Sequence, residues 1–132
     1  MLRLAEQWSE YSTCLHRQVG AVLYHPDTKA VVGIGYNDTP IGHIDCGDGG
    51  CARCADPATA RLSLDCDCVH AEMQPVLFAA RRGIATEGCY LATTYAPCRS
   101  CVKNLMQAGV KAVTLRDEKD GTVRTVPLRE FW

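Results

Sequence analysis

The chain has 132 residues, of which 47% are hydrophobic and 22% are charged, and its formal net charge is −1. This length fits one compact domain, and the composition is that of a soluble globular protein. No apolar run is long enough to cross a bilayer, and the near-neutral charge argues against a basic face that would bind a polynucleotide backbone. Glu6, Gln7 and Glu10 interrupt the N-terminal segment, which argues against a secretory signal and predicts a cytosolic protein.

The first part of the chain predicts a helix followed by a β-hairpin. Residues 2–13 carry apolar side chains at roughly helical spacing. Residues 19–25 and 30–37 are β-rich, and the turn 26–29 between them contains proline and aspartate.

Residues 38–68 follow neither the helical nor the strand period, and a structureless connection of this length would be unusual. The segment is acidic and rich in cysteine, so bound metal could order what a hydrophobic core cannot. We therefore expect one domain over residues 1–132, with a cysteine-rich, metal-ordered insertion at about 38–68.

The remainder alternates between helices and strands. Pro75 suits the first turn of its helix, and Gly83 ends that helix. The overall order is α-β-β-α-β-α-β-β, which predicts an α/β fold with a partly parallel sheet and helices on its faces. The elements predicted here are a helix over 69–82, a strand over 88–94, a helix over 98–108, and a hairpin of strands over 110–115 and 122–128.

Nine cysteines dominate the composition, and the missing signal together with the CxxC spacings favours metal binding over disulfides. Cys89 stands in an apolar run and is predicted to be a small core residue. The other cysteines are Cys14, Cys46, Cys51, Cys54, Cys66, Cys68, Cys98 and Cys101.

Two short motifs carry the chemistry. His70-Ala71-Glu72 opens one predicted helix, and Pro97-Cys98-Arg99-Ser100-Cys101 opens the next. The pair H-x-E and P-C-x-x-C is an established signature of zinc deaminases. Both sulfurs at a helix start face the same side, and the positive end of the helix favours thiolates.

Three ligands, His70, Cys98 and Cys101, would leave one tetrahedral position of zinc open to water, which is the mark of a catalytic site. That water ionises near neutral pH, and Glu72 could carry its proton to the ring nitrogen and then to the departing ammonia. A structural zinc half-site or a redox pair could also use a CxxC. Neither requires a carboxylate two residues from the histidine, so the catalytic interpretation is favoured.

These motifs make the chain resemble the cytidine and deoxycytidylate deaminase superfamily, most closely its deoxycytidylate (dCMP) deaminase branch. The resemblance implies a three-layer α/β/α sandwich around a mixed five-stranded sheet, and a homo-oligomer. It also implies that Asn37 meets the sugar hydroxyl and that the backbone around Ala71 meets the pyrimidine. It rests on residues 12–23, 33–42, 46–54, 67–73 and 96–113.

Several positions depart from the family pattern. Asp38 stands where glycine is usual, Gln74-Pro75 replace Asn-Ala, and His16, followed by Arg17, occupies the place of an arginine. The pattern therefore supports the chemistry more directly than it supports one particular cytosine derivative.

The resemblance also implies a second, structural zinc, because bacterial and phage relatives carry one. Its ligands would map to Cys14, Cys46 and either Cys66 or Cys68. Six thiols exceed one tetrahedral site, so one four-cysteine site with spare thiols and two metals sharing sulfurs both remain open. The order of preference for the ligands is Cys14, Cys46, Cys51 and Cys66, then Cys54 and Cys68.

The leading functional hypothesis is hydrolytic deamination of a cytosine nucleotide, dCMP or a relative, to the uracil product and ammonia. It requires one catalytic zinc and predicts at least one structural zinc. An adenosine deaminase acting on tRNA or another polynucleotide shares the motifs but predicts a basic rim. A non-catalytic, zinc-stabilised binding module is the third hypothesis, and it gives no chemical role to Glu72. We therefore expect a small nucleotide as the partner, rather than a polynucleotide or a membrane.

Overall fold

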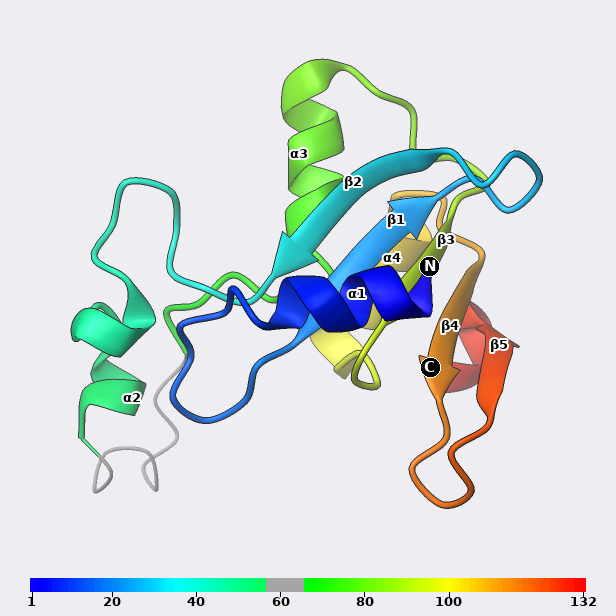
Figure 1. Cartoon of the computed structure of the whole chain (residues 1–132). Coiled ribbons are helices and arrows are strands. Elements are labelled where there is room, and N and C mark those ends of the chain that lie inside the picture. The colour runs from blue at the N-terminus through cyan, green and yellow to red at the C-terminus, as the bar shows by residue number, and fades with distance from the viewer. Residues whose placement is uncertain (57–65) are drawn as a thin grey trace.

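A single five-stranded sheet organises the chain, for which the computed structural model describes residues 1–56 and 66–132 (Figure 1). The strand order is β2-β1-β3-β4-β5, with β3 and β4 parallel and every other neighbouring pair antiparallel. The elements are α1 (Leu2–Ser9), β1 (Gly20–Tyr24), β2 (Val31–Tyr36), η1 (Cys46–Asp48), α2 (Ala52–Ala55), α3 (Gln74–Arg82), β3 (Tyr90–Thr93), α4 (Arg99–Gln107), β4 (Ala112–Arg116), β5 (Val123–Pro127) and η3 (Leu128–Phe131).

Helices cover both faces of the sheet, and β1 shows why. Its five residues are all buried, and their side chains alternate between two cores. Ala21 and Leu23 belong to the larger core beneath α3 and α4, whereas Val22 and Tyr24 face the smaller core under α1. In Figure 1, α1 crosses one face while α3 and α4 lie on the other. The predicted α/β/α sandwich with a mixed five-stranded sheet is confirmed.

The order of long elements agrees with the prediction, including both hairpins and the position of every strand. Within residues 38–68, where the sequence showed neither period, the structure contains two short helices, η1 and α2. Residues 57–65 of the predicted insertion lie outside the described residues. Among the described residues, no helix is long and apolar enough to span a membrane.

Two predicted helices are shorter than expected. The helix expected over 69–82 begins at Gln74, so His70 and Glu72 lie in the turn before α3 instead of opening it. Pro75 explains the shift, because it has no N–H to donate to the carbonyl of Ala71. The helix expected over 2–13 ends at Ser9, since Ser12 turns away to donate its hydroxyl to the Asn37 carbonyl at 2.6 Å.

Close packing between α3 and β2 determines where the turn before α3 can lie. A Cβ atom on Gly35 would overlap the carbonyl oxygen of Ala71, the residue between His70 and Glu72. Glycine at this position therefore lets the turn lie directly against the strand.

Gly35→Ala is expected to lower the free energy of unfolding by about 1–3 kcal/mol, because either the strand or the turn must move. The same displacement should reduce any activity that depends on His70 and Glu72. Gly33→Ala, on the same strand, is the matched control: its Cβ would lie 3.1 Å from Pro75 and should be tolerated better. Chemical denaturation of the two variants measures the difference, and equal stability of Gly35→Ala and wild type would contradict this account of the packing.

Candidate active site and metal-binding residues

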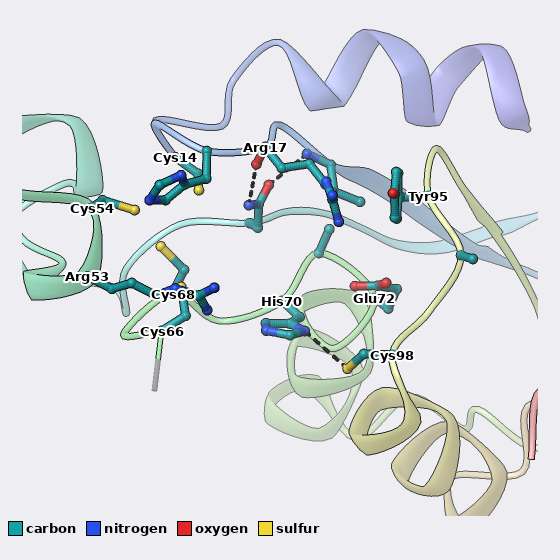
Figure 2. Close-up of a pocket in the computed structure, with 15 residues that line it drawn as sticks. Cys14, Arg17, Arg53, Cys54, Cys66, Cys68, His70, Glu72, Tyr95 and Cys98 are labelled. Carbon is teal, nitrogen blue, oxygen red and sulfur yellow. Dashed lines mark hydrogen bonds between the residues drawn. The ribbon is translucent and has the colours of Figure 1, made fainter. Parts of the chain in front are cut away.

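The two motifs singled out in the sequence meet in space. The His70 Nδ1 atom lies 3.6 Å from the Cys98 sulfur and 3.4 Å from the Cys101 sulfur. All three ligand atoms lie within 4.8 Å of one another. Figure 2 shows His70, from the turn before α3, facing Cys98 at the start of α4. The predicted trio is therefore brought together by two segments that are far apart in the sequence.

These separations fit a zinc ion. Bonds of ~2.3 Å to sulfur and ~2.0–2.1 Å to nitrogen at the tetrahedral angle place the two ligand atoms about 3.6 Å apart. The two observed nitrogen–sulfur distances, 3.6 and 3.4 Å, lie close to this value. Among the described residues, no fourth histidine, cysteine or carboxylate joins the group. A zinc ion held by this donor set would have one position left for water or substrate.

The start of α4 positions both sulfurs. Cys98 is the N-cap residue, and its sulfur accepts a weak hydrogen bond from the Cys101 backbone N–H at 3.5 Å. Burial raises the pKa of the Cys101 thiol, and the nearby charges of Glu72 and Cys98 raise it further. A bound cation would offset this cost and hold the sulfur as the thiolate.

Glu72 lies beside the trio without belonging to it. Its side chain is only 5% exposed, and the carboxylate points into the cavity near His70 (Figure 2). Burial raises the pKa of this carboxyl, although its own backbone N–H and the charge of His70 oppose the rise. A buried carboxyl beside an open metal position is suited to exchanging protons with a bound reactant.

A cavity of about 540 Å³ opens at this point, within the range usual for small-molecule sites. His70, Glu72 and Cys98 form one wall, and Ala71 also lines the space. Three basic residues also line the cavity: the Arg17 guanidinium lies 3.9 Å from the centre of the Tyr95 ring, and Arg53 and His16 are further lining residues. Sequence analysis noted His16 and Arg17 only as a departure from the family pattern and did not single out Arg53, because only the folded chain shows that all three line one cavity.

Asn37 lines the cavity, but its amide also has structural partners. The side-chain oxygen accepts hydrogen bonds from the Val19 N–H at 2.7 Å and the Ser12 hydroxyl at 2.9 Å. Its nitrogen donates to the Arg17 carbonyl at 2.7 Å. Asn37 therefore holds the segment that carries His16 and Arg17 against the cavity.

The remaining cysteines, apart from Cys89, gather in one cluster. All nine cysteines are free thiols, and Cys89 is fully buried in the main core, as predicted. Burial raises the pKa of Cys54 and Cys68. Burial acts in the same direction on Cys51, but the N–H groups of Asp67 and Cys54 outweigh it and lower that pKa to about 7. The six members, called here the thiol cluster, are Cys14, Cys46, Cys51, Cys54, Cys66 and Cys68.

Asp38 ties the thiol cluster to the sheet, a role that sequence reasoning missed. Its Oδ1 atom accepts hydrogen bonds from the Thr13 hydroxyl at 2.7 Å, the Thr39 N–H at 2.8 Å and the Cys46 N–H at 3.3 Å. Its backbone pairs with Val69. Burial opposes ionisation of Asp38, but these hydrogen bonds outweigh it and hold its pKa below the usual range. The signal available in the sequence was an aspartate where the family carries glycine.

Comparison with known proteins agrees with this site. Residues 1–116 match the model of the cytidine and deoxycytidylate deaminase zinc-binding region. The chain belongs to this family. The deoxycytidylate deaminase of Schizosaccharomyces pombe is 34% identical over 113 residues, which cover 85% of this chain and 34% of that protein. ComE operon protein 2 of Bacillus subtilis is 36% identical over 102 residues, which cover 77% of this chain and 49% of that protein. The chain thus spans about a third to a half of the length of these relatives.

Solved structures show the same fold. The dCMP deaminase of cyanophage S-TIM5, in complex with dCMP and dUMP, has a TM-score of 0.69 and 30% identity. That match covers 87% of this chain and 76% of the phage enzyme. Cytidine deaminase from Burkholderia pseudomallei has a TM-score of 0.62 at 18% identity, which shows likeness of fold alone, over 98% of this chain and 91% of that one.

Asp38→Ala is expected to lower the free energy of unfolding by about 1–3 kcal/mol, because it leaves the Thr13 hydroxyl and the Cys46 N–H without their acceptor. Asp27→Ala, in the exposed hairpin turn, is the control and should change stability by less than about 0.5 kcal/mol. Denaturant titration followed by circular dichroism measures both. Equal losses in the two variants would show that Asp38 is not the link between the cluster and the sheet.

Proposed function

We propose that this protein hydrolyses the exocyclic amine of a cytosine nucleotide, dCMP or a close relative, releasing ammonia and the uracil nucleotide. The observation that carries the proposal is the approach of His70 Nδ1 to within 3.6 Å of both Cys98 and Cys101 sulfurs, beside the buried carboxyl of Glu72. Membership of the deaminase family supports the same chemistry. The domain would comprise residues 1–132, including the insertion at about 38–68.

His70, Cys98 and Cys101 would hold the catalytic zinc. A zinc ion bound there supplies Lewis acidity, which lowers the pKa of coordinated water to near 7. Two thiolates and a neutral imidazole balance the charge of the cation, so the site suits an attack on an uncharged pyrimidine ring. His70 must be neutral at Nδ1 to act as a ligand.

Glu72 would move the protons of the reaction. As a carboxylate it accepts a proton from the attacking water, and as a carboxylic acid it donates that proton to the ring nitrogen next to the amine-bearing carbon. It then takes the remaining hydroxyl proton and delivers it to the departing amine, so that water and the cytosine nucleotide yield ammonia and the uracil nucleotide. Burial of Glu72 keeps bulk water from competing for these transfers.

The basic residues in the lining of the cavity support an anionic substrate. Arg17, Arg53 and His16 line the cavity and could bind a phosphate. Tyr95, stacked on the Arg17 guanidinium, restricts where that charge can lie. The S-TIM5 enzyme, which binds dCMP and dUMP, supports a nucleotide monophosphate as substrate. Asn37 and the backbone of Ala71 would contact the sugar and the base.

Glu72→Gln should retain the fold and the zinc at residues 70, 98 and 101 but reduce kcat for deamination by about 10²–10⁴-fold, because the amide cannot exchange the proton. Steady-state ammonia release measures turnover, and elemental analysis counts the metal. Glu10→Gln, at the exposed end of α1, is the matched control and should leave kcat unchanged. Wild-type turnover in Glu72→Gln would refute the assigned mechanism.

Arg17→Ala should raise KM for dCMP by about 10–100-fold, because a charged hydrogen bond to phosphate is lost, while changing KM for deoxycytidine little. Arg129→Ala, an exposed arginine outside the cavity, is the control. The same assay with cytidine, CMP, the triphosphates and a tRNA defines the substrate class. A parallel rise in KM for both deoxycytidine and dCMP would remove Arg17 from the phosphate site, and deamination of tRNA alone would overturn the nucleotide proposal.

A further inference from the structure

The thiol cluster contains more sulfur than one metal can bind. Its residues form three overlapping groups whose ligand atoms lie within 4.8 Å of one another: Cys14 with Cys46 and Cys68, Cys46 with Cys51 and Cys54, and Cys51 with Cys66 and Cys68. Five of the six are buried, and Cys66 is half-buried. Each group shares a member with each of the others, so the six thiols form one continuous cluster.

A disulfide does not account for this packing. The Cys51 and Cys66 sulfurs are 4.0 Å apart, about twice the length of a disulfide bond. Two sulfurs bound to one tetrahedral zinc lie about 3.8 Å apart, which is close to the observed separation. The spacing is therefore that of thiolates around a cation.

Counting ligands decides between one metal and two. A single zinc takes four thiolates and would leave two thiols buried against it without a role. Two tetrahedral ions need eight coordination positions, and six sulfurs fill them only if two sulfurs bridge both metals. We infer that the thiol cluster is a binuclear zinc site in which Cys46 and Cys51 are shared by both ions.

The positions of the six residues select the shared pair. Cys46, Cys51 and Cys68 each belong to two of the three groups, and of these only Cys46 and Cys51 are fully buried. Cys14 and Cys54 contact each other, and each shares a group with Cys46. Cys66 and Cys68 also contact each other, and both share a group with Cys51. Each ion thus takes the two bridging sulfurs and one flanking pair.

The cluster joins the segments that bound the cavity. Cys14 precedes His16 and Arg17, Cys54 follows Arg53, and Cys68 lies two residues before His70. In Figure 2 these cysteines lie at one end of the cavity, away from Cys98. Two divalent cations leave six thiolates with a residual charge of about −2, and the nearby Arg53 offsets part of it. The binuclear site would therefore hold the basic residues His16, Arg17 and Arg53 in place while taking no part in the reaction.

The test is metal counting on the full chain, with the catalytic site removed as a separate arm. Wild-type protein should contain about three zinc ions, and Cys98→Ala, which removes an exposed catalytic ligand, should contain two. X-ray absorption of Cys98→Ala should then show a zinc neighbour at roughly 3 Å, the separation imposed by two shared sulfurs. These readouts do not depend on turnover, so failure of the deaminase proposal would leave them unchanged.

Variants of the cluster distinguish bridging from terminal sulfurs. In the Cys98→Ala background, Cys66→Ser should lose at most one zinc, whereas Cys46→Ser should lose both. If the bridging variant fails to fold, two coupled ¹¹³Cd resonances in cadmium-substituted Cys98→Ala report the same connectivity. One zinc in Cys98→Ala, iron with labile sulfide, or six thiols that react freely in the native protein would each overturn the binuclear site.

Discussion

The approach of the His70 imidazole to the two thiols of α4 depends on how tightly the turn before α3 lies against the sheet. Gly35 on β2 leaves room for the carbonyl of Ala71. This close contact sets the distance between the strand and the turn that carries His70 and Glu72. The helix α3 begins at Gln74, after that turn, with Pro75 in its first turn. Within this turn the His70 and Glu72 side chains point to different places. One faces the sulfurs, and the other faces the cavity.

Two kinds of interior hold the chain together. The sheet and its helices bury aliphatic side chains in a continuous core, and Leu23, Leu91 and Leu105 are completely inaccessible. The region around η1 and α2 has short helices and a core made of cysteine instead. Cysteine side chains are too small to supply much hydrophobic stabilisation, and the proposed metal–sulfur bonds would supply it there instead. Asp38 connects the two interiors through hydrogen bonds from Thr13 and Cys46.

The two interiors, the hydrophobic core and the thiol cluster, also support different parts of the proposed site. The residues proposed to carry the reaction come from the turn before α3 and the start of α4, which rest on the hydrophobic core. Most of the cationic lining comes from segments attached to the thiol cluster, namely His16 and Arg17 after Cys14, and Arg53 before Cys54. Two departures from the family pattern also lie in the segments attached to the thiol cluster. His16 lines the cavity, and Asp38 holds the cluster against the sheet. Substitutions in these segments could therefore change which nucleotide binds without altering the H-x-E and P-C-x-x-C motifs.

The sequence alone determined the order of the long elements, the two hairpins, and which histidine, cysteines and carboxylate are proposed to act together. These features depend on local periodicity and on spacings within a few residues, such as that from Cys98 to Cys101. Both can be read directly from the sequence. Only the tertiary structure decided that Arg17, Tyr95 and Arg53 share a cavity with Glu72, because those contacts join segments that no periodicity relates. It also decided that Asp38 is a buried acceptor and that six cysteines form one cluster. Such contacts arise from close packing between distant segments, and a local pattern carries no information about them.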